Sequence, residues 1–532
     1  MKEVKSNKLS EEEFSYVVLL VRDHSMEVTP AVATMCEYFE LEYSTEMTNY
    51  CKKKLDKMGI ISDRTLEESQ EYIDAKNRTF DKNASAFLIT YAQSYAKLNK
   101  KMLQEMEAYA SEINAEIIII PGRYKNPTSL SKSKEITDNE KRISPWPEET
   151  LKYLFASPQS IHRDITICAD LKIQPTAALP LSGIESFTSD QTTIVGHPRI
   201  HLITPPRIEG YHEKVLLTTG SITDSEYTDT KIGKIGEFHH QYGFTIVELN
   251  NNEYHIRQIQ CENDGSFYDL DNFVKDGTVV KYREAPLGIV LGDLHIGEED
   301  KQAVKSSFDM IEKLRVRNVI CHDIFNGHSI SHHEKNNIII QYNREKDGTN
   351  SLSSEIETMC QFFENAPKDL NFVCVRSNHD DFLDRWITDN DWRRNPNKVD
   401  YLKYVNAIVE GNAPKGVIPY VLENRFKNVT GLYIDSTYVV GDYECAMHGH
   451  VGANGSRGSA NQFKKLHTKT ITGHTHAPIR IDGHISVGCL TKKRVGYNVG
   501  PSSWMHANVI IYPNGKASHI FLTKSYKWTT LM

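Results

Sequence analysis

Apolar and polar residues along the chain alternate in runs that predict strands and helices in turn. From residue 84, ASAFLITYAQ predicts a strand, NKKMLQEMEAYASEIN has helical apolar spacing, and AEIIIIPGRY predicts a second strand. Such a unit implies a parallel sheet with helices packed against it. RDITICADL, KVLLTTGS and YGFTIVELNNNEYHIRQI continue the pattern, so we expect an α/β domain over residues 84–278. It contains neither GxGxxG nor GxxxxGK[ST], and its role stays open.

The first 75 residues are predicted to form a small helical unit. In TPAVATMCEYFELE, Thr29 is a candidate N-cap and Pro30 the first helical residue. A second helix, STEMTNYCKKKLDKMG, is expected to begin at Ser44 and end at Gly59. Its apolar face holds Met47, Tyr50, Cys51, Leu55 and Met58. Two helices joined so tightly suggest a helix-turn-helix that offers DNA phosphates Lys52, Lys53, Lys54 and Lys57. The alternative is an ordinary helical pair with solvated lysines.

Residues 281–532 repeat one arrangement, in which an apolar strand ends in a polar cluster. The five cases are PLGIVLGDLHIG, VRNVICHDIFNG, LNFVCVRSNHDD, YECAMHGHVG and TKTITGHTHAP. Strand ends are where α/β sheets place their active sites. We therefore expect the chemistry of the chain in this third domain.

The last cluster poses a specific question, because His474 and His476 flank a single threonine. Residues two apart in an extended chain face the same side, and imidazole is the commonest metal ligand. On their own they would be two surface histidines in a loop. The other clusters supply further ligands, namely Asp293, His295, Asp323, Asn378 and His448. This mixture of nitrogen and oxygen suits manganese, iron or zinc better than calcium or magnesium.

Composition narrows the class of protein. A chain of 532 residues with 39% hydrophobic and 25% charged residues is expected to be globular, with more than one domain. It has no apolar run of membrane-spanning length and no signal-peptide core near its start, and its nine cysteines form no CxxC pair. We therefore expect a cytoplasmic protein with reduced thiols and no membrane partner. Residues 281–532 carry 31 Lys and Arg against 27 Asp and Glu, so phosphate is not repelled there.

The order of the clusters, D-x-H, D-x-x-N, N-H-D, H-G and G-H-x-H, resembles the calcineurin-like metallophosphoesterase family over residues 285–512. The resemblance implies a β-sandwich flanked by helices, with two metal ions along one edge. Carried over, the ligands of the first ion are Asp293, His295, Asp323 and His476, and those of the second are Asp323, Asn378, His448 and His474. Two residues depart from the pattern: His322 and Ser377 stand where the family usually has glycine.

The resemblance also implies a mechanism. Two cations lower the pKa of a bridging water and clamp the phosphate during in-line attack. His379 would face the substrate as a catalytic residue, with Asp380 orienting it, although a purely structural His379 is the alternative. His450 either touches substrate or hydrogen-bonds a carbonyl.

The loop HGHVGANGSRGSANQFKKL bears on the substrate. Arg457 could grip a phosphate, and Ser459 could cap a helix that starts at Ala460 and favours an anion. The alternative is a glycine-rich loop that merely turns a corner. With YNVGPSSWMH near residue 500, this loop resembles phage-encoded members of the family. That resemblance implies a manganese-dependent DNase acting on host DNA in the infected cytoplasm, with a homo-oligomer left open.

Two other functions compete with a DNase. The first is a phosphatase or cyclic-nucleotide phosphodiesterase, although such enzymes are often one compact domain. The second is a DNA-binding or scaffold protein with an inactive phosphoesterase fold. Intact ligands at all seven positions favour an enzyme over the latter.

Overall fold

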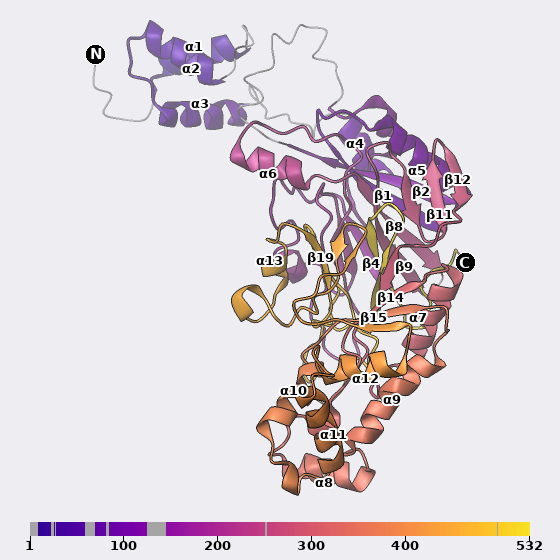
Figure 1. Cartoon of the computed structure of the whole chain (residues 1–532). Helices are drawn as coiled ribbons and strands as arrows, with labels where there is room; N and C mark the ends of the chain where they lie inside the picture. The colour runs from indigo at the N-terminus through magenta and orange to yellow at the C-terminus, as the bar shows by residue number, and fades with distance from the viewer. Residues whose placement is uncertain are drawn as a thin grey trace. The chain divides into compact units, whose positions relative to one another are not determined.

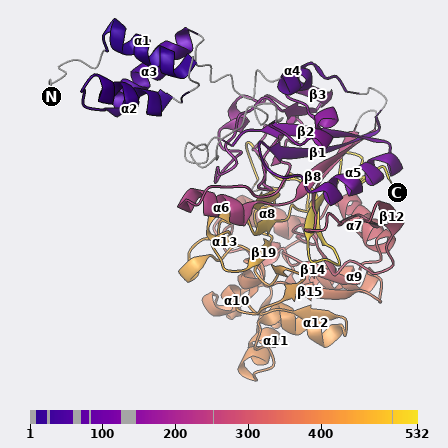
Figure 2. The ribbon, with the colours of Figure 1, turned by 90° about the horizontal axis from the view of Figure 1, so that it is seen from above.

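The computed structural model describes residues 9–22, 26, 28–58, 70–80, 84–124, 145–250, 253–496 and 498–531. The chain forms two compact units, Met1–Asn77 and Arg78–Met532. The protein is mixed α/β, with several sheets (Figures 1 and 2). Residues 84–278 and 281–532, which we expected to form separate domains, both lie in the second unit.

The first unit is helical, as expected. Its helices are α1 (Glu11–Arg22), α2 (Val28–Tyr38), α3 (Thr45–Lys57) and α4 (Gln70–Asn77). The first three helices share one core, to which α3 contributes the predicted Met47, Cys51 and Leu55. The Ser44 hydroxyl accepts a hydrogen bond from the Met47 amide at 3.2 Å and so caps α3. Thr29 was predicted as the N-cap of α2, but the helix already begins at Val28.

The lysines of α3 differ in their surroundings. Lys52 and Lys53 are exposed. The Lys54 ammonium lies 4.0 Å from the centre of the Phe14 ring, a cation–π contact that ties α3 to α1. The side chain of Lys57 lies outside the described residues, as does Gly59. Lys52 and Lys53 are therefore the candidates for phosphate contact.

The second unit begins with the predicted strand–helix–strand motif. Strands β1 (Ala86–Gln93) and β2 (Ala115–Gly122) pair in parallel, with α5 (Lys100–Glu112) between them in sequence. They belong to a four-stranded sheet of order β2-β1-β8-β9. Its other strands are β8 (Gly243–Asn250) and β9 (Glu253–Gln260). A smaller sheet consists of β10 (Phe267–Asp269), β11 (Asn272–Lys275) and β12 (Thr278–Lys281).

A ten-stranded sheet joins the middle of the chain to its C-terminal part. Its strands are, in spatial order, β17 (Val439–Val440), β18 (Tyr443–Glu444), β19 (Lys469–Thr472), β21 (His484–Ser486), β20 (Ile479–Ile481), β6 (Leu202–Ile203), β7 (Leu216–Thr218), β5 (Thr192–Val195), β4 (Ile165–Cys168) and β3 (Pro158–His162). The two halves meet where Leu202 of β6 pairs with Arg480 of β20. The expected boundary near residue 280 therefore falls inside one sheet-linked unit.

A six-stranded sheet carries the first strand-end motifs. Its strands are β16 (Val429–Gly431), β15 (Asn371–Cys374), β14 (Asn318–Cys321), β13 (Gly288–Val290), β22 (Ala507–Ile511) and β23 (Ala517–Phe521). Successive residues face opposite sides. Ile289 and Val319 join a core with the helices, whereas Val290 and Ile320 join a core with residues of the ten-stranded sheet. The six-stranded sheet is thus covered by helices on one face and by a second sheet on the other.

The remaining helices belong to the second unit. They are α6 (Lys231–His239), α7 (Lys301–Lys313), α8 (Ile338–Asp347), α9 (Leu352–Asn365), α10 (Asp380–Asp389), α11 (Lys398–Val409), α12 (Val417–Arg425) and α13 (Ala460–Phe463). Helices α10, α11 and α12 pack against one another (Figures 1 and 2). Among the helices in the described ranges, none combines the length and the apolar character needed to cross a membrane. All nine cysteines are free.

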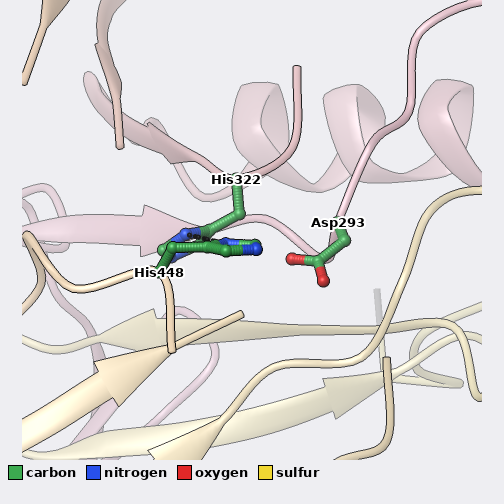
Figure 3. A group of neighbouring side chains, drawn as sticks. All are labelled: Asp293, His322 and His448. Atoms are coloured by element: carbon green, nitrogen blue, oxygen red, sulfur yellow. Dashed lines mark hydrogen bonds between the residues drawn. The ribbon is translucent and has the colours of Figure 1, made fainter. Parts of the chain in front are cut away.

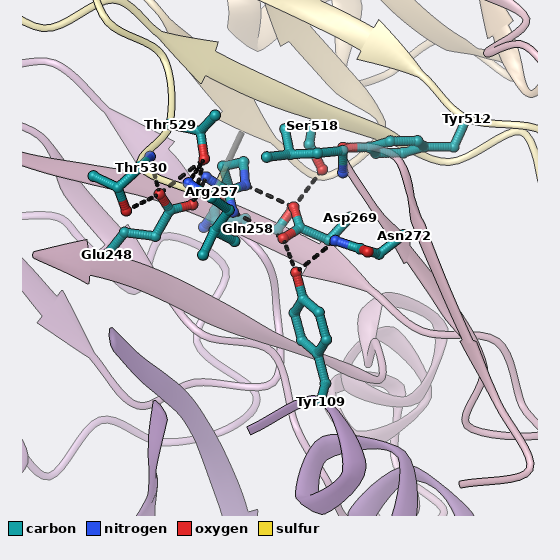
Figure 4. Close-up of polar contacts among 12 residues, drawn as sticks. Tyr109, Glu248, Arg257, Gln258, Asp269, Asn272, Tyr512, Ser518, Thr529 and Thr530 are labelled. Carbon is teal, nitrogen blue, oxygen red and sulfur yellow. Dashed lines mark hydrogen bonds and ion pairs between the residues drawn. The ribbon is translucent and has the colours of Figure 1, made fainter. Parts of the chain in front are cut away.

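A buried ionic network ties the end of the chain to the four-stranded sheet. Arg257 forms a two-pronged pair with Asp269, at 2.6 and 2.8 Å, and an ion pair with Glu248 (Figure 4). Glu248 also accepts hydrogen bonds from the Thr529 hydroxyl and the Thr530 amide. A buried charge is tolerated only when it is paired. This network therefore fixes the position of the C-terminal segment that contains Thr529 and Thr530.

Candidate metal centre

The five predicted clusters converge because of the strand directions. Strands β13, β14 and β15 run parallel, so their carboxyl ends meet at one edge of the six-stranded sheet. Asp293 and His295 follow β13, Asp323 follows β14, and Asn378 follows β15. In the facing sheet, β18 and β19 are also parallel and precede the remaining histidines, His448, His474 and His476. The structure therefore brings the seven proposed ligands together.

The first proposed ligand set is tightly clustered. The Nε2 atom of His295 lies 3.1 Å from Nε2 of His476 and 3.3 Å from Oδ2 of Asp323. His476 Nε2 in turn lies 3.1 Å from Oδ2 of Asp293. All four side chains are buried.

The second set is built around the same carboxylate oxygen. His448 Nε2 lies 3.2 Å from Asp323 Oδ2 and 3.0 Å from the amide oxygen of Asn378. His474 Nδ1 lies 3.1 Å from that amide oxygen. Asp323 Oδ2 is therefore the atom that the two sets share.

These side chains fit a metal centre. Ligand atoms about 2.1 Å from one ion lie about 3 Å from each other, which is the spacing seen here. Asp293 Oδ1 and Asp323 Oδ1 are buried and have no hydrogen-bond partner among the described residues. Buried groups of histidine and aspartate with ligand atoms within 4.8 Å could hold metal ions; they are Asp293–His322–His448, His295–Asp323–His379 and Asp293–Asp323–His476.

The charges of the centre favour ionised carboxylates. Burial raises the pKa of Asp323, but the facing His448 and His295 more than offset it and hold that pKa well below its usual range. Burial lowers the pKa of His448, but Asp323 and the neighbouring carboxylates outweigh it and raise the pKa to about 9. A cation bound here would replace the proton on His448 as the partner of Asp323.

The backbone at the strand ends is strained. His295, Asp323, His474 and His476 have φ values of 44°, 47°, 72° and 57°, in the left-handed region that residues with a side chain rarely adopt. Such strain persists where the surrounding structure fixes it, and it gathers at functional sites. Gly473 is required for a different reason, since a Cβ there would lie 2.2 Å from Asp293 Oδ1.

His379 lies at the edge of the centre. Its Nδ1 donates to the carbonyl of Asn326 at 2.6 Å, and its ring centre lies 4.5 Å from that of His295. Burial lowers the pKa of His379 to about 4, so its ring is neutral near pH 7 with a lone pair on Nε2.

Asp380 does not orient His379 as expected. Its Oδ2 accepts from the Ser377 amide at 3.0 Å, while the Ser377 hydroxyl accepts from the Asp380 amide at 3.2 Å. This reciprocal pair is a capping box that starts α10. It accounts for serine in the place of glycine, and it leaves the Asn326 carbonyl as the group that holds His379. Burial raises the pKa of Asp380 to about 7.

The proposed substrate contacts are placed differently from one another. His450 lies beside the centre, with its ring 5.3 Å from that of His448 and its Nε2 3.6 Å from Asp381 Oδ2. Arg457 is exposed on the glycine-rich loop. Ser459 stands at the N-cap of α13, but its hydroxyl makes no capping bond and the helix is only four residues long. The predicted anion site at this helix is therefore not supported.

Sequence reasoning missed two neighbours of the centre. The Asn326 carbonyl has no side-chain signature from which it could have been found. Trp504 packs its ring 4.0 Å from that of His476, and its only signal was its place in the YNVGPSSWMH stretch. The adjacent His239 and His240 lie outside the centre: His239 is the last residue of α6 and His240 its C-cap, with Nε2 2.7 Å from the Thr223 carbonyl oxygen.

Comparison with known proteins shows a phage relative. Protein A1 of Escherichia phage T5 is 27% identical to this chain over 465 residues, which cover 82% of each protein. No protein-family model matches the sequence. No solved structure matches it significantly. The chain is thus similar to a phage protein over most of its length.

Proposed function

We propose that this chain is a two-metal phosphodiesterase of the calcineurin-like metallophosphoesterase type and that its substrate is DNA. The observation that carries the proposal is the clustering of seven ligand side chains around Asp323, whose Oδ2 lies 3.3 Å from His295 Nε2 and 3.2 Å from His448 Nε2. The other ligands adjoin these two histidines or one another, at 3.0–3.1 Å. The sandwich of sheets with the cluster at its edge agrees with that fold. Similarity to a phage protein supports a place of action in an infected host cell.

The reaction follows from the placement of the side chains. Two divalent cations, when bound, activate a water and offset the charge of the phosphate. Manganese fits the mixed donor set, with iron and zinc as the other choices. Asp293, Asp323 and Asn378 would supply the oxygen ligands, and His295, His448, His474 and His476 would supply nitrogen. His379 keeps its Nε2 free to take up a proton at the edge of the site, because Nδ1 is held by Asn326.

The test is hydrolysis of three substrates by the full chain. Linear DNA, circular DNA and p-nitrophenyl phosphate are each incubated with Mn²⁺, Mg²⁺ or EDTA. We expect cleavage of DNA with Mn²⁺ and none with EDTA. Turnover of the small phosphate alone would point to a phosphatase. Binding of Mn²⁺ without hydrolysis of any substrate would point to an inactive DNA-binding or scaffold protein.

A further inference from the structure

His322 stands directly behind one of the proposed ligands. Its side chain is fully buried, and its Nδ1 lies 3.4 Å from Nδ1 of His448. The two ring centres are 5.4 Å apart with an angle of 37° between the planes. Figure 3 shows the rings beside each other, with the Asp293 carboxylate close to them.

The geometry fixes which nitrogen of His448 carries a proton. Its Nε2 faces Asp323 Oδ2 and Asn378 Oδ1, so a metal ligand at this position must keep its lone pair on Nε2. The proton of the neutral ring is then on Nδ1, and it points at His322. His322 Nδ1 must therefore be the acceptor.

The same reasoning extends to Asp293. A neutral His322 that accepts at Nδ1 carries its own proton on Nε2. His322 Nε2 and Asp293 Oδ1 are both buried without a hydrogen-bond partner among the described residues. Asp293, His322 and His448 each have a polar atom within 4.8 Å of the others. Gly473 packs against both Asp293 and His322, because a Cβ there would lie 2.2 Å from Asp293 Oδ1 and 2.9 Å from His322 Cγ.

We propose that His322 is a positioning residue that sets the tautomer of His448. Asp293 belongs to the first ligand set and His448 to the second, so His322 stands beside a ligand of each metal position. Partners of this kind orient metal-bound histidines and raise their basicity. The inference rests on the proposed function, because it assigns a role toward the metal.

The test measures Mn²⁺ binding rather than turnover. Free Mn²⁺ is followed by electron paramagnetic resonance while the metal-free full chain is titrated. His322→Leu fills similar space but cannot accept a hydrogen bond. We expect it to lower the Mn²⁺ affinity of the site that contains His448 by about 10–100-fold. His322→Asn returns an acceptor near the place of Nδ1, and we expect it to restore most of the affinity.

The matched control is His484→Leu. His484 is another buried histidine, and its Nδ1 bonds to the Thr470 hydroxyl at 2.8 Å. We expect it to bind Mn²⁺ as the parent does, which separates a specific loss from a general effect of losing a buried imidazole. Unfolding of the metal-free proteins, followed by circular dichroism, checks that each variant is folded.

The outcomes separate the two proposals. A parent with two Mn²⁺ sites and an unaffected His322→Leu would overturn the role of His322 alone. Equal losses in His322→Leu and His322→Asn would overturn it too, because the acceptor would not matter. Three ions per parent chain would make His322 a ligand instead of a positioning residue. A parent that binds no Mn²⁺ would overturn the proposed function together with this inference.

Discussion

Asp323 is the residue on which both halves of the proposed centre depend. Its Oδ2 lies 3.3 Å from His295 Nε2 and 3.2 Å from His448 Nε2. We expect Asp323→Ala to lose both ions and all phosphodiester hydrolysis, since one carboxylate serves both positions. Elemental analysis after dialysis measures the loss. Asp369→Ala, which removes an exposed carboxylate paired with Arg317, is the control and should keep its metal. Two ions retained by Asp323→Ala would contradict the bridge.

His379 is expected to act on the substrate and not on the metal. We predict that His379→Ala keeps its metal while turnover falls by about 100-fold or more, the usual scale of help from a positioned acid or base. Metal content and hydrolysis of DNA are measured on the same preparation. A nitrogen of His379 lies within 4.8 Å of ligand atoms of His295 and Asp323, close enough to bind the metal. The metal content of the variant therefore distinguishes a catalytic His379 from a metal ligand. Loss of metal in this variant would make His379 a ligand.

The sequence could select the ligand side chains but not their supports. The seven ligands follow apolar strands, and that pattern is local in sequence. The supports stand in the same clusters, but their roles did not show there: a backbone carbonyl at Asn326, a ring at His322 and a capping box at Ser377. The role expected of Asp380 was wrong because its carboxylate is taken up by the start of α10. Which nitrogen faces which partner depends on tertiary distances that no motif contains.

At the scale of elements, local patterns predicted best where they spanned several turns or a full strand. The motif of β1, α5 and β2 was predicted from periodicity and is confirmed. The helix expected to start at Ala460 is also present as the single turn α13, but it was predicted from its candidate cap Ser459, whose side chain makes no capping bond, and not from periodicity. A four-residue element leaves too few positions for a period to be visible.

Helix α3 offers a test of DNA contact by the first unit. Lys52 and Lys53 are exposed, so a double Lys→Ala variant should lose a phosphate footprint without loss of packing. If the helix binds DNA, affinity falls and the slope of log affinity against log salt becomes shallower by up to about 2. Fluorescence anisotropy with labelled DNA at several salt concentrations measures both.

Lys54→Ala is the control variant for the DNA-binding test. It lies on the same helix and removes the cation–π contact with Phe14. We expect it to lower the stability of the helical unit by about 0.5–1 kcal/mol, the range for an exposed cation–π contact. Parent-like affinity and salt slope in the Lys52 and Lys53 double variant would assign these helices to packing or assembly.

At the scale of the molecule, the arrangement of the sheets could not be predicted from the sequence. The ten-stranded sheet depends on the pairing of β6 with β20, which brings Leu202 beside Arg480. Pairing between strands so far apart in the sequence produces no pattern in the local sequence of either strand. The buried Arg257, which connects strand β9 to the end of the chain through Glu248, is likewise a tertiary feature.

Buried histidines outside the metal centre should make the larger unit sensitive to acid. Burial lowers the pKa to about 3 for His197 and His484, and to about 4 for His240, His255 and His519. In the unfolded chain a histidine takes up its proton near pH 6.5. Between about pH 6.5 and pH 4 the unfolded state therefore binds more protons than the folded state.

The sign of the effect follows. The stabilisation is fully present above about pH 6.5 and is lost as the pH falls toward 4, with each histidine contributing at most about 1.4 kcal/mol per pH unit. We expect the free energy of unfolding in urea, measured in EDTA to exclude metal, to fall steadily from about pH 7 to pH 5.

All five tryptophans lie in the larger unit, so their fluorescence reports its unfolding alone. His484→Asn keeps a partner for Thr470 but cannot titrate, and its pH dependence should be shallower by up to one proton. A free energy that rises toward pH 5, or an unchanged slope in His484→Asn, would show that these rings do not stay neutral in the folded protein.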